Sequence, residues 1–323
     1  MNPHPYADLT PGVILDAIES VGIELDGRLQ SLNSYENRVY KLGCEDGSSV
    51  VAKFYRPQRL SDAAIEQEHA FSLALQRQEL PVVAPMVFSG QSLHWHEGFR
   101  FAVFPNQGGH APEFESAEHL SWMGRILARI HNVGASMNLD QRAQLDVDSL
   151  GEIPFAWLLE NKPMPEHLLD RYEQVGGDLL DCIDSAIEQA GEGINMIAIH
   201  GDCHPGNILW TDAGPHFVDL DDCVRGPAVQ DLWMMLSGDR PAREAQFEAI
   251  AEGYEQFRPF DRRELKLIES LRSLRMMHYA YWLARRWEDP AFPQNFPWFG
   301  TERYWDEHIA SLAEQAERIE KEL

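Results

Sequence analysis

The segment Ile199–Trp210 constrains the fold of this chain more than any other stretch. It reads IHGDCHPGNILW, and it is followed first by TDAGP and then by HFVDLDD. A loop dense in polar side chains therefore leads into a short apolar strand, a turn and a second apolar strand. This order is the pattern of an antiparallel hairpin, which fixes the end of the loop relative to the second strand.

The register of the predicted hairpin brings two oxygen-bearing side chains together. A five-residue turn pairs Ile208 with Val218, and Asn207 then lies directly opposite Asp219. Directly opposed residues of an antiparallel pair have Cβ atoms about 5 Å apart. An amide oxygen beside a carboxylate suits Mg²⁺, which takes one or two protein ligands while substrate phosphates and water complete its shell. We therefore expect Asn207 and Asp219 to hold Mg²⁺.

Asp202 supplies the remaining part of a reactive site. It follows the apolar run INMIAI and precedes Asn207 by five residues, and its carboxylate can accept a proton from an incoming hydroxyl. The spacing from His200 to Asp202 and Asn207, followed by Asp219 at the close of a strand, is the layout of a kinase catalytic loop and metal site. The pattern predicts phosphoryl transfer with Asp202 as the catalytic base.

Three other interpretations of this segment compete with phosphoryl transfer. His200, Cys203 and His204 could hold zinc, although a further ligand is needed and cytosolic Cys/His sites usually show paired spacing. The zinc site also leaves the predicted hairpin register unexplained. A metallophosphoesterase could use Asp202, His204 and Asp219, but it requires a second group of ligands that is hard to find. The segment could also be a structural Gly-Pro turn with polar caps.

A lysine within an apolar strand suggests where phosphate charge would be neutralised. In VVAKFY, strand alternation places Val51, Lys53 and Tyr55 on one face. A buried lysine is costly unless it pairs with an anion, and phosphoryl transfer needs a cation on the phosphates. The alternative is a lysine that points to water from an edge strand.

The charge balance excludes several classes of partner. The 323 residues include 27 Lys and Arg against 52 Asp and Glu, for a formal net charge of −25. Such a surface repels nucleic-acid backbones and anionic membranes, so we expect neither as a partner. Four cysteines without CxxC spacing, no signal peptide and no apolar stretch near the ~18 residues of a membrane helix indicate a reduced, cytoplasmic chain.

Strand patterns dominate the first third of the chain. Hairpin turns are expected at Asp46-Gly47 and at Glu97-Gly98. Ser61 is expected to cap a helix that begins DAAIEQEHAFSLALQ. A small sheet with one helix is therefore predicted.

Helical patterns follow the stretch PNQGG. Long amphipathic repeats predict helices over 117–134, 264–287 and 302–323. The simplest division is a small sheet-rich lobe joined to a large helical lobe. The expected parts are an N-terminal nucleotide-binding lobe over 1–104, a hinge over 105–109, and a C-terminal catalytic and substrate lobe over 110–323.

The same motifs resemble those of a known enzyme family. HGDCHPGNILW and FVDLDD are similar to the HGDxHxxN signature of the aminoglycoside phosphotransferase and choline kinase family. NSYENRVY, VAKFYRP, GPAVQDLWMML and DPAFPQNFPW resemble bacterial serine/threonine protein kinases of the stress response within that family. The resemblance covers nearly the whole chain. It implies a protein-kinase-like, bilobal α+β fold with ATP as co-substrate and Mg²⁺ as cofactor.

The resemblance also implies roles for residues of the sheet-rich lobe. Lys53 contacts the nucleotide phosphates and pairs with a glutamate of the following helix, for which Glu68 is preferred to Glu66. The turn NSYEN takes the place of a glycine-rich loop, so Ser34 and Asn37 are expected to contact phosphate. Ser34 is also a candidate autophosphorylation site. The alternative is an ordinary polar turn.

Two further parts of the site are implied in the same way. The backbone from Phe104 to Asn106 is expected to meet the adenine edge. Asp231 is expected to brace the catalytic loop. Asp221 and Asp222 follow the metal aspartate as neighbours on a strand and point opposite ways, so at most one faces the site.

The acceptor is the least constrained part of this hypothesis. Only eleven residues separate Asp219 from Asp231, too few for the long segment by which ordinary protein kinases dock peptides. The resemblance implies a serine or threonine of a protein, and we expect a monomer. The alternatives are a small-molecule alcohol, such as choline, homoserine or an aminoglycoside, and a nucleotide-binding adaptor without turnover.

Overall fold

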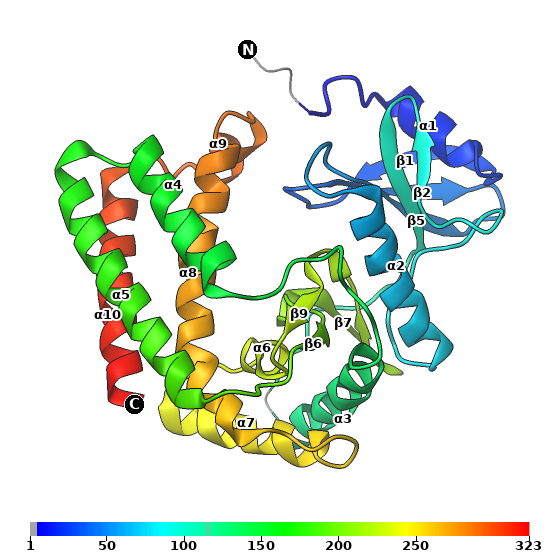
Figure 1. The fold of residues 1–323 in the computed structure, drawn as a ribbon. Coiled ribbons are helices and arrows are strands. Elements are labelled where there is room, and N and C mark those ends of the chain that lie inside the picture. The colour runs from blue at the N-terminus through cyan, green and yellow to red at the C-terminus, as the bar shows by residue number, and fades with distance from the viewer. Residues whose placement is uncertain (1–4, 115, 323) are drawn as a thin grey trace. The chain divides into compact units, whose positions relative to one another are not determined.

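The computed structural model describes residues 5–114 and 116–322, which form two compact units (Figure 1). The first unit contains the chain as far as Ala143 together with Ile197–Arg225 and Met234–Pro259. The second contains Gln144–Met196, Gly226–Trp233 and the chain from Phe260 onward. The predicted hinge at 105–109 is a different division, and it stays a prediction.

A five-stranded antiparallel sheet in the order β1-β2-β3-β5-β4 begins the first unit. Its strands are β1 (Leu25–Ser31), β2 (Arg38–Cys44), β3 (Ser49–Phe54), β4 (His94–His96) and β5 (Phe99–Pro105). The two expected hairpin turns are confirmed. Gly47 has a φ of +84°, and Glu97 and Gly98 have φ of +46° and +86°, the left-handed backbone that tight hairpins require.

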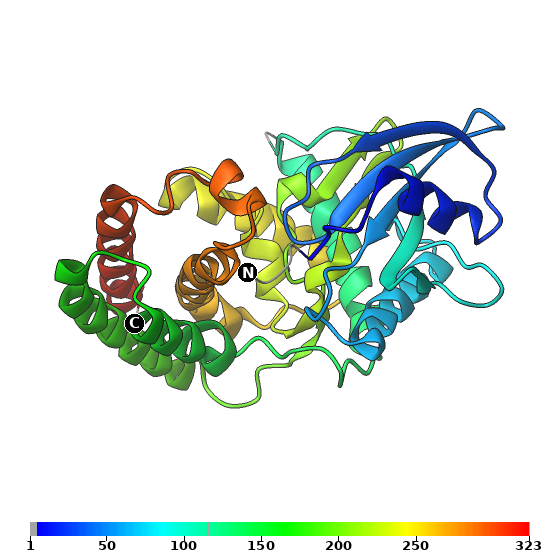
Figure 2. The same cartoon turned by 90° about the horizontal axis from the view of Figure 1, so that it is seen from above.

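Helices cover both faces of this sheet (Figures 1 and 2). Helix α1 (Pro11–Glu19) packs against the face that carries Phe54, in a core with Ile14 and Phe101. This helix was not predicted, although Thr10 accepts a hydrogen bond from the Val13 amide as an N-cap. Lys53 therefore points to the opposite face of the sheet.

Helix α2 (Asp62–Arg77) covers the opposite face. Ser61 caps it as predicted, because its Oγ accepts from the Ala64 amide at 3.1 Å. Ile65 packs there with Tyr55 and Ala102 of the sheet region. The helix thereby carries Glu68 toward the face of the sheet that presents Lys53.

Two packed helices and two short sheets make up the rest of the first unit, which includes the loop that carries Asp202. Helices α3 (Ala117–Gly134) and α7 (Arg240–Tyr254) pack against each other, and α3 has the bounds that the sequence predicts. Two short sheets complete the unit, one from β6 (Ile197–Ile199) and β9 (Val224–Gly226), and one from β7 (Ile208–Thr211) and β8 (Gly214–Phe217).

The register predicted for the β7–β8 hairpin is wrong by one residue. Ile208 pairs with Phe217 rather than Val218, and Thr211 pairs with Gly214 across a two-residue turn. Asn207 therefore lies opposite Val218, whose amide donates to the Asn207 carbonyl at 3.0 Å. Asp219 lies one residue beyond this pair, outside the ladder.

The second unit is helical. It contains α4 (Ile153–Asn161), α5 (Leu169–Ala190), α6 (Val229–Trp233), α8 (Ile268–Arg286), α9 (Ala291–Asn295) and α10 (Glu302–Glu322). The long helices α5 and α10 lie side by side and share a core with α8 (Figures 1 and 2). The predicted helix over 264–287 begins later, because residues 262–267 form a 3₁₀ turn. Within the described residues, no helix has the length and apolar character that crossing a bilayer requires.

Candidate active site

The loop after β6 positions Asp202. Gly201 has a φ of +84°, and a Cβ at this position would overlap the carbonyl oxygen of Asp222, so only glycine fits. Asn207 then closes the loop, because its Nδ2 donates to the Asp202 carbonyl oxygen at 2.9 Å and to Asp202 Oδ2 at 3.2 Å. The carboxylate of Asp202 is thereby held in one orientation at the end of a buried strand.

Asp219 occupies an unusual backbone conformation at the end of the hairpin. Its φ of 60° and ψ of 62° are left-handed, which is uncommon for a residue other than glycine and often marks a functional site. Its Oδ1 lies 2.7 Å from Lys53 Nζ, and about half of its side-chain surface is exposed. The sequence predicts a strand here, but Leu220–Asp222 form a 3₁₀ turn.

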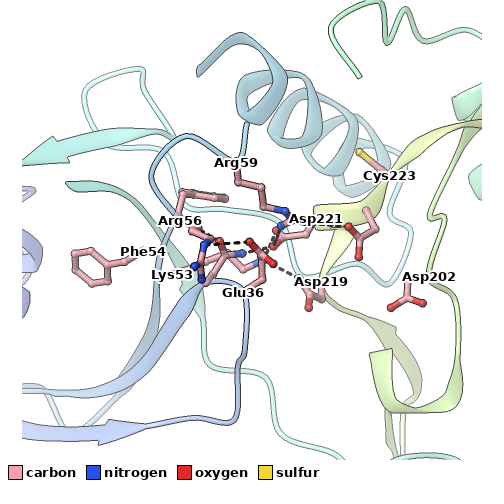
Figure 3. Close-up of polar contacts among 12 residues, drawn as sticks. Glu36, Lys53, Phe54, Arg56, Arg59, Asp202, Asp219, Asp221 and Cys223 are labelled. Carbon is pink, nitrogen blue, oxygen red and sulfur yellow. Dashed lines mark hydrogen bonds and ion pairs between the residues drawn. The ribbon is translucent and has the colours of Figure 1, made fainter. Parts of the chain in front are cut away.

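Lys53 pairs with two aspartates of this segment. Its Nζ lies 2.7 Å from Asp219 Oδ1 and 2.5 Å from Asp221 Oδ1 (Figure 3). Burial alone would lower the pKa of Lys53, but the two carboxylates outweigh it and raise that pKa. The lysine is therefore charged, as a phosphate-binding cation must be, and the edge-strand alternative is wrong because its side chain is buried.

Asp221 is the buried member of the aspartate pair. Arg59 approaches its Oδ2 at 3.3 Å, and Asn37 Nδ2 donates to the same oxygen. Burial raises the pKa of Asp221, but Lys53 and Arg59 reverse this and lower the pKa to about 2. Asp222 is exposed and pairs with Arg59 at 2.6 Å. Only Asp221 contacts the lysine, although the two neighbours lie in a 3₁₀ turn and not on the predicted strand.

The predicted Lys53–Glu68 ion pair is not formed. Glu68 is buried on α2, yet its Oε2 has no hydrogen-bond partner among the described residues. Burial, with the negative charge of Asp221, raises the pKa of Glu68 to about 8, although Lys53 opposes the shift. Lys53 pairs with Asp221 instead of Glu68. The sequence could not reveal this pairing, because the two residues are 168 positions apart.

Hydrogen bonds within the turn and to other segments fix the turn between β1 and β2. Ser34 Oγ accepts from the Val39 amide at 3.2 Å. Asn37 is buried, and its side chain donates to Asp221 and accepts from the Arg56 amide at 3.0 Å. Asn37 therefore braces the turn through both polar atoms of its side chain, and its phosphate contact stays a prediction. Ser34 likewise remains a predicted phosphate contact of this turn.

The end of β5 provides the predicted nucleotide-base region. The Phe104 ring lies 5.7 Å from Lys53 Nζ, on the same face of the sheet. Asn106 is exposed, and its Nδ2 donates to Ser49 Oγ at 3.0 Å. Phe104 and Pro105 pair with Val51 and Val50 of β3 in the sheet. The contact of the backbone from Phe104 to Asn106 with a base edge stays a prediction.

The donor groups of the loop do not form a zinc or two-metal site. Across residues 5–114 and 116–322, no group of three or more His, Cys, Asp or Glu side chains is placed to hold a metal ion. His200 Nε2 contacts the Val218 carbonyl oxygen at 3.0 Å, and His204 Nδ1 accepts from the Gly206 amide at 2.9 Å. The histidines are therefore engaged with backbone groups.

An oxygen-ligated cation fits better. The Asn207 amide donates to Asp202 through Nδ2, which leaves its Oδ1 available, and Asp219 contributes a half-exposed carboxylate. One amide oxygen and one carboxylate are hard ligands that suit Mg²⁺ and leave most of its shell for phosphates and water.

Several residues around this site were missed in the sequence. Arg142 donates to the Asp221 carbonyl oxygen, and through Nε to the Cys223 carbonyl oxygen at 2.9 Å. Tyr6 donates from its hydroxyl to the Glu36 carbonyl oxygen at 3.0 Å and so supports the turn after β1. None of these residues lies in a recognisable motif, so tertiary structure alone identifies them.

Comparison with known proteins points to one family. The model of the phosphotransferase enzyme family matches residues 28–268. Stress response kinase A of Escherichia coli (strain K12) is 42% identical over 316 residues, which are 98% of this chain and 95% of that protein. The serine/threonine protein kinase RdoA of Salmonella typhimurium (strain LT2) is 41% identical over 314 residues, 97% of this chain and 94% of that protein.

The fold agrees with a solved kinase structure. Amicoumacin kinase hAmiN, in complex with AMP-PNP, Ca²⁺ and Ami, matches with a TM-score of 0.75 and 17% identity, over 98% of this chain and 96% of that chain. At this identity the match shows the fold alone. It confirms the expected protein-kinase-like architecture of helices and an antiparallel sheet.

Proposed function

The chain belongs to the phosphotransferase enzyme family, and from this premise we propose that it is a Mg²⁺-dependent kinase that passes the γ-phosphate of ATP to serine or threonine hydroxyls of proteins. One observation carries the proposal. Lys53 lies 2.7 Å from Asp219, and Asp202 is hydrogen-bonded to Asn207 in the same compact unit. A phosphate-binding cation, two oxygen ligands and a proton acceptor are the parts that this chemistry requires.

The proposed reaction assigns one task to each of these residues. Asp202 takes the proton of the acceptor hydroxyl as its oxygen bonds to the γ-phosphorus. The bond from that phosphorus to the β–γ bridging oxygen breaks, and ADP leaves. Lys53 neutralises phosphate charge, while Asn207 and Asp219 would hold Mg²⁺. When bound, Mg²⁺ supplies further neutralisation of the charge on the phosphates.

The proposal of a protein acceptor rests on the names of the relatives, and the loop length limits how a peptide could dock. The relative from Salmonella typhimurium is named a serine/threonine protein kinase, and it is 41% identical over 97% of this chain. Only eleven residues separate Asp219 from Asp231, so a docked peptide would need a surface other than a long activation segment. We propose the chain itself as one acceptor, through Ser34.

A small-molecule alcohol is the second candidate acceptor. The solved relative with a TM-score of 0.75 is an amicoumacin kinase bound to Ami, and its fold extends over 98% of this chain. The short segment after Asp219 is compatible with this reaction too, because a small molecule needs no peptide-docking segment.

A panel of acceptors separates the two candidates. Purified protein with Mg²⁺ and γ-labelled ATP is offered generic basic and acidic proteins, choline, homoserine and aminoglycosides in parallel. We expect label on Ser or Thr of a protein, including the kinase itself, with the small molecules at background. Label on a small molecule at ten or more times the rate for any protein would replace the protein acceptor with an alcohol acceptor.

A further inference from the structure

We propose that Asp221, rather than Glu68, is the acidic residue that positions Lys53 for the nucleotide phosphates. The proposal rests on the proposed function, which gives Lys53 its task and leaves Asp221 without one. It makes Asp221 a positioning residue, because it acts on the nucleotide through the lysine.

Both carboxylate oxygens of Asp221 are engaged by residues of the sheet region. Oδ1 lies 2.5 Å from Lys53 Nζ, whereas Oδ2 receives Asn37 Nδ2 and lies 3.3 Å from Arg59. Figure 3 shows Lys53 and Arg59 reaching this carboxylate while Phe54 points away from it. The main chain is fixed as well, since Arg142 donates to the Asp221 carbonyl oxygen. Both carboxylate oxygens and the main-chain carbonyl oxygen of Asp221 therefore have partners.

Glu68 lacks the contacts that would make it the partner. It is only 2% exposed, yet among the described residues its Oε2 has no hydrogen-bond partner. A carboxyl group buried in this way resists ionisation, and the pKa of about 8 is consistent with a neutral side chain at neutral pH. Lys53 Nζ forms its ion pairs with Asp219 and Asp221 and not with Glu68.

The difference matters when nucleotide binds. Asp219 now shares Lys53 with Asp221, but the proposed function requires Asp219 to become a metal ligand. Asp221 is buried and tied to Arg59 and Asn37, so it stays beside the lysine and keeps Nζ in place. The Asn37 bond also ties the turn after β1 to the same carboxylate, so one side chain aligns the two predicted phosphate-contacting elements.

Matched neutral variants of the two acids test the proposal. Asp221→Asn and Glu68→Gln each remove one buried carboxylate near Lys53 and change little in size. We expect Asp221→Asn to raise the KM for ATP and to lower kcat/KM at least 30-fold, and at least ten times more than Glu68→Gln does. Equal losses, or a larger loss in Glu68→Gln, would overturn the assignment.

A second measurement follows the chemical reactivity of the Lys53 amine and does not require phosphoryl transfer. Acetylation of Lys53 by acetic anhydride at pH 8.5 is followed by mass spectrometry, with Lys41 of β2 as the internal reference. We expect the ratio of Lys53 to Lys41 labelling to rise at least fivefold in Asp221→Asn and less than twofold in Glu68→Gln. The reverse order would overturn the proposal.

Two controls keep the outcomes separate. If the unmutated protein transfers no phosphate, the proposed function fails, while the labelling ratio still decides whether Asp221 holds the lysine. Melting temperatures show whether the variants fold. Should Asp221→Asn unfold at the assay temperature, Glu68→Gln alone decides, because a fivefold rise in Lys53 labelling in that variant contradicts the proposal.

Discussion

At the scale of single residues, the site depends on which anion accompanies a buried lysine. The strand pattern around Lys53 predicts a buried cation that needs a partner, and the structure confirms that need. The identity of the partner could not be predicted, because local periodicity places Glu68 on the adjacent helix but says nothing of Asp221 across the fold. The need of Lys53 for an anion was therefore predictable from the sequence, whereas its pairing with Asp221 was not.

Glu68 should make stability depend on pH. Its pKa is raised from 4.5 to about 8 in the folded protein by burial and by Asp221. Between pH 4.5 and pH 8, Glu68 is ionised in the unfolded chain but still protonated in the folded chain. The contribution of protonated Glu68 to the free energy of unfolding is therefore full below pH 4.5, and it is lost as pH rises through 8. Glu68→Gln stays neutral, so its Tm relative to the unmutated protein should increase by at least about 2 °C from pH 5 to pH 8.

Thermal unfolding followed by circular dichroism across this pH range checks the expectation. Glu66→Gln is the matched control, because it removes a glutamate from an exposed position of the same helix. A Glu68→Gln difference that stays constant from pH 5 to pH 8 would show that Glu68 ionises normally in the folded state.

At the scale of elements, caps and glycine turns are predictable, whereas register is not. Ser61 and the Gly47 and Gly98 turns agree with the sequence because each depends on local backbone chemistry. The β7–β8 hairpin could close with a turn of two or five residues, and the shorter turn places Gly214, with a φ of +110°, at the first paired position. A shift of one residue changes every opposed pair. Asp219 is consequently oriented by its left-handed backbone rather than by a ladder.

The contact between α3 and α7 should tolerate no side chain at its closest point. A Cβ on Gly124 would overlap the carbonyl oxygen of Ile250, and one on Gly253 would overlap the carbonyl oxygen of Ser121. Backbone cannot yield as a flexible side chain does. Gly124→Ala should therefore lower the free energy of unfolding by about 2 kcal/mol or more, despite the better helix propensity of alanine.

Gly177→Ala on α5 is the control, because nothing lies within 4 Å of its Cβ position. We expect the free energy of unfolding of this variant to be about 0.5–1 kcal/mol higher than that of the unmutated protein. Urea unfolding of both variants gives the comparison. Equal stabilities for the two alanine variants would mean that α3 and α7 do not approach as closely as described.

At the scale of the whole molecule, an acidic chain has to bind an acidic nucleotide. The formal net charge is −25, yet Lys53 and Arg59 lie at the site, and Asp221 is the carboxylate they share. Nearby charges affect such a site more than the net charge does. Salt at 0.1 M screens the interaction between exposed charges that are more than about 10 Å apart. The protein-kinase-like fold class follows from the resemblance of the motifs to those of a known family. The division into compact units does not, since the first unit joins three separate stretches of chain.

The most direct measurement of the central claim is single-turnover transfer of γ-phosphate from Mg-ATP by the unmutated protein and by Asp202→Asn. We expect the transfer rate of the variant to be at least about a hundredfold lower than that of the unmutated protein. Its Kd for ATP, measured by calorimetry, should stay within about threefold, because Asp202 acts on the acceptor hydroxyl and not on the nucleotide. Transfer by Asp202→Asn at the rate of the unmutated protein would contradict the account.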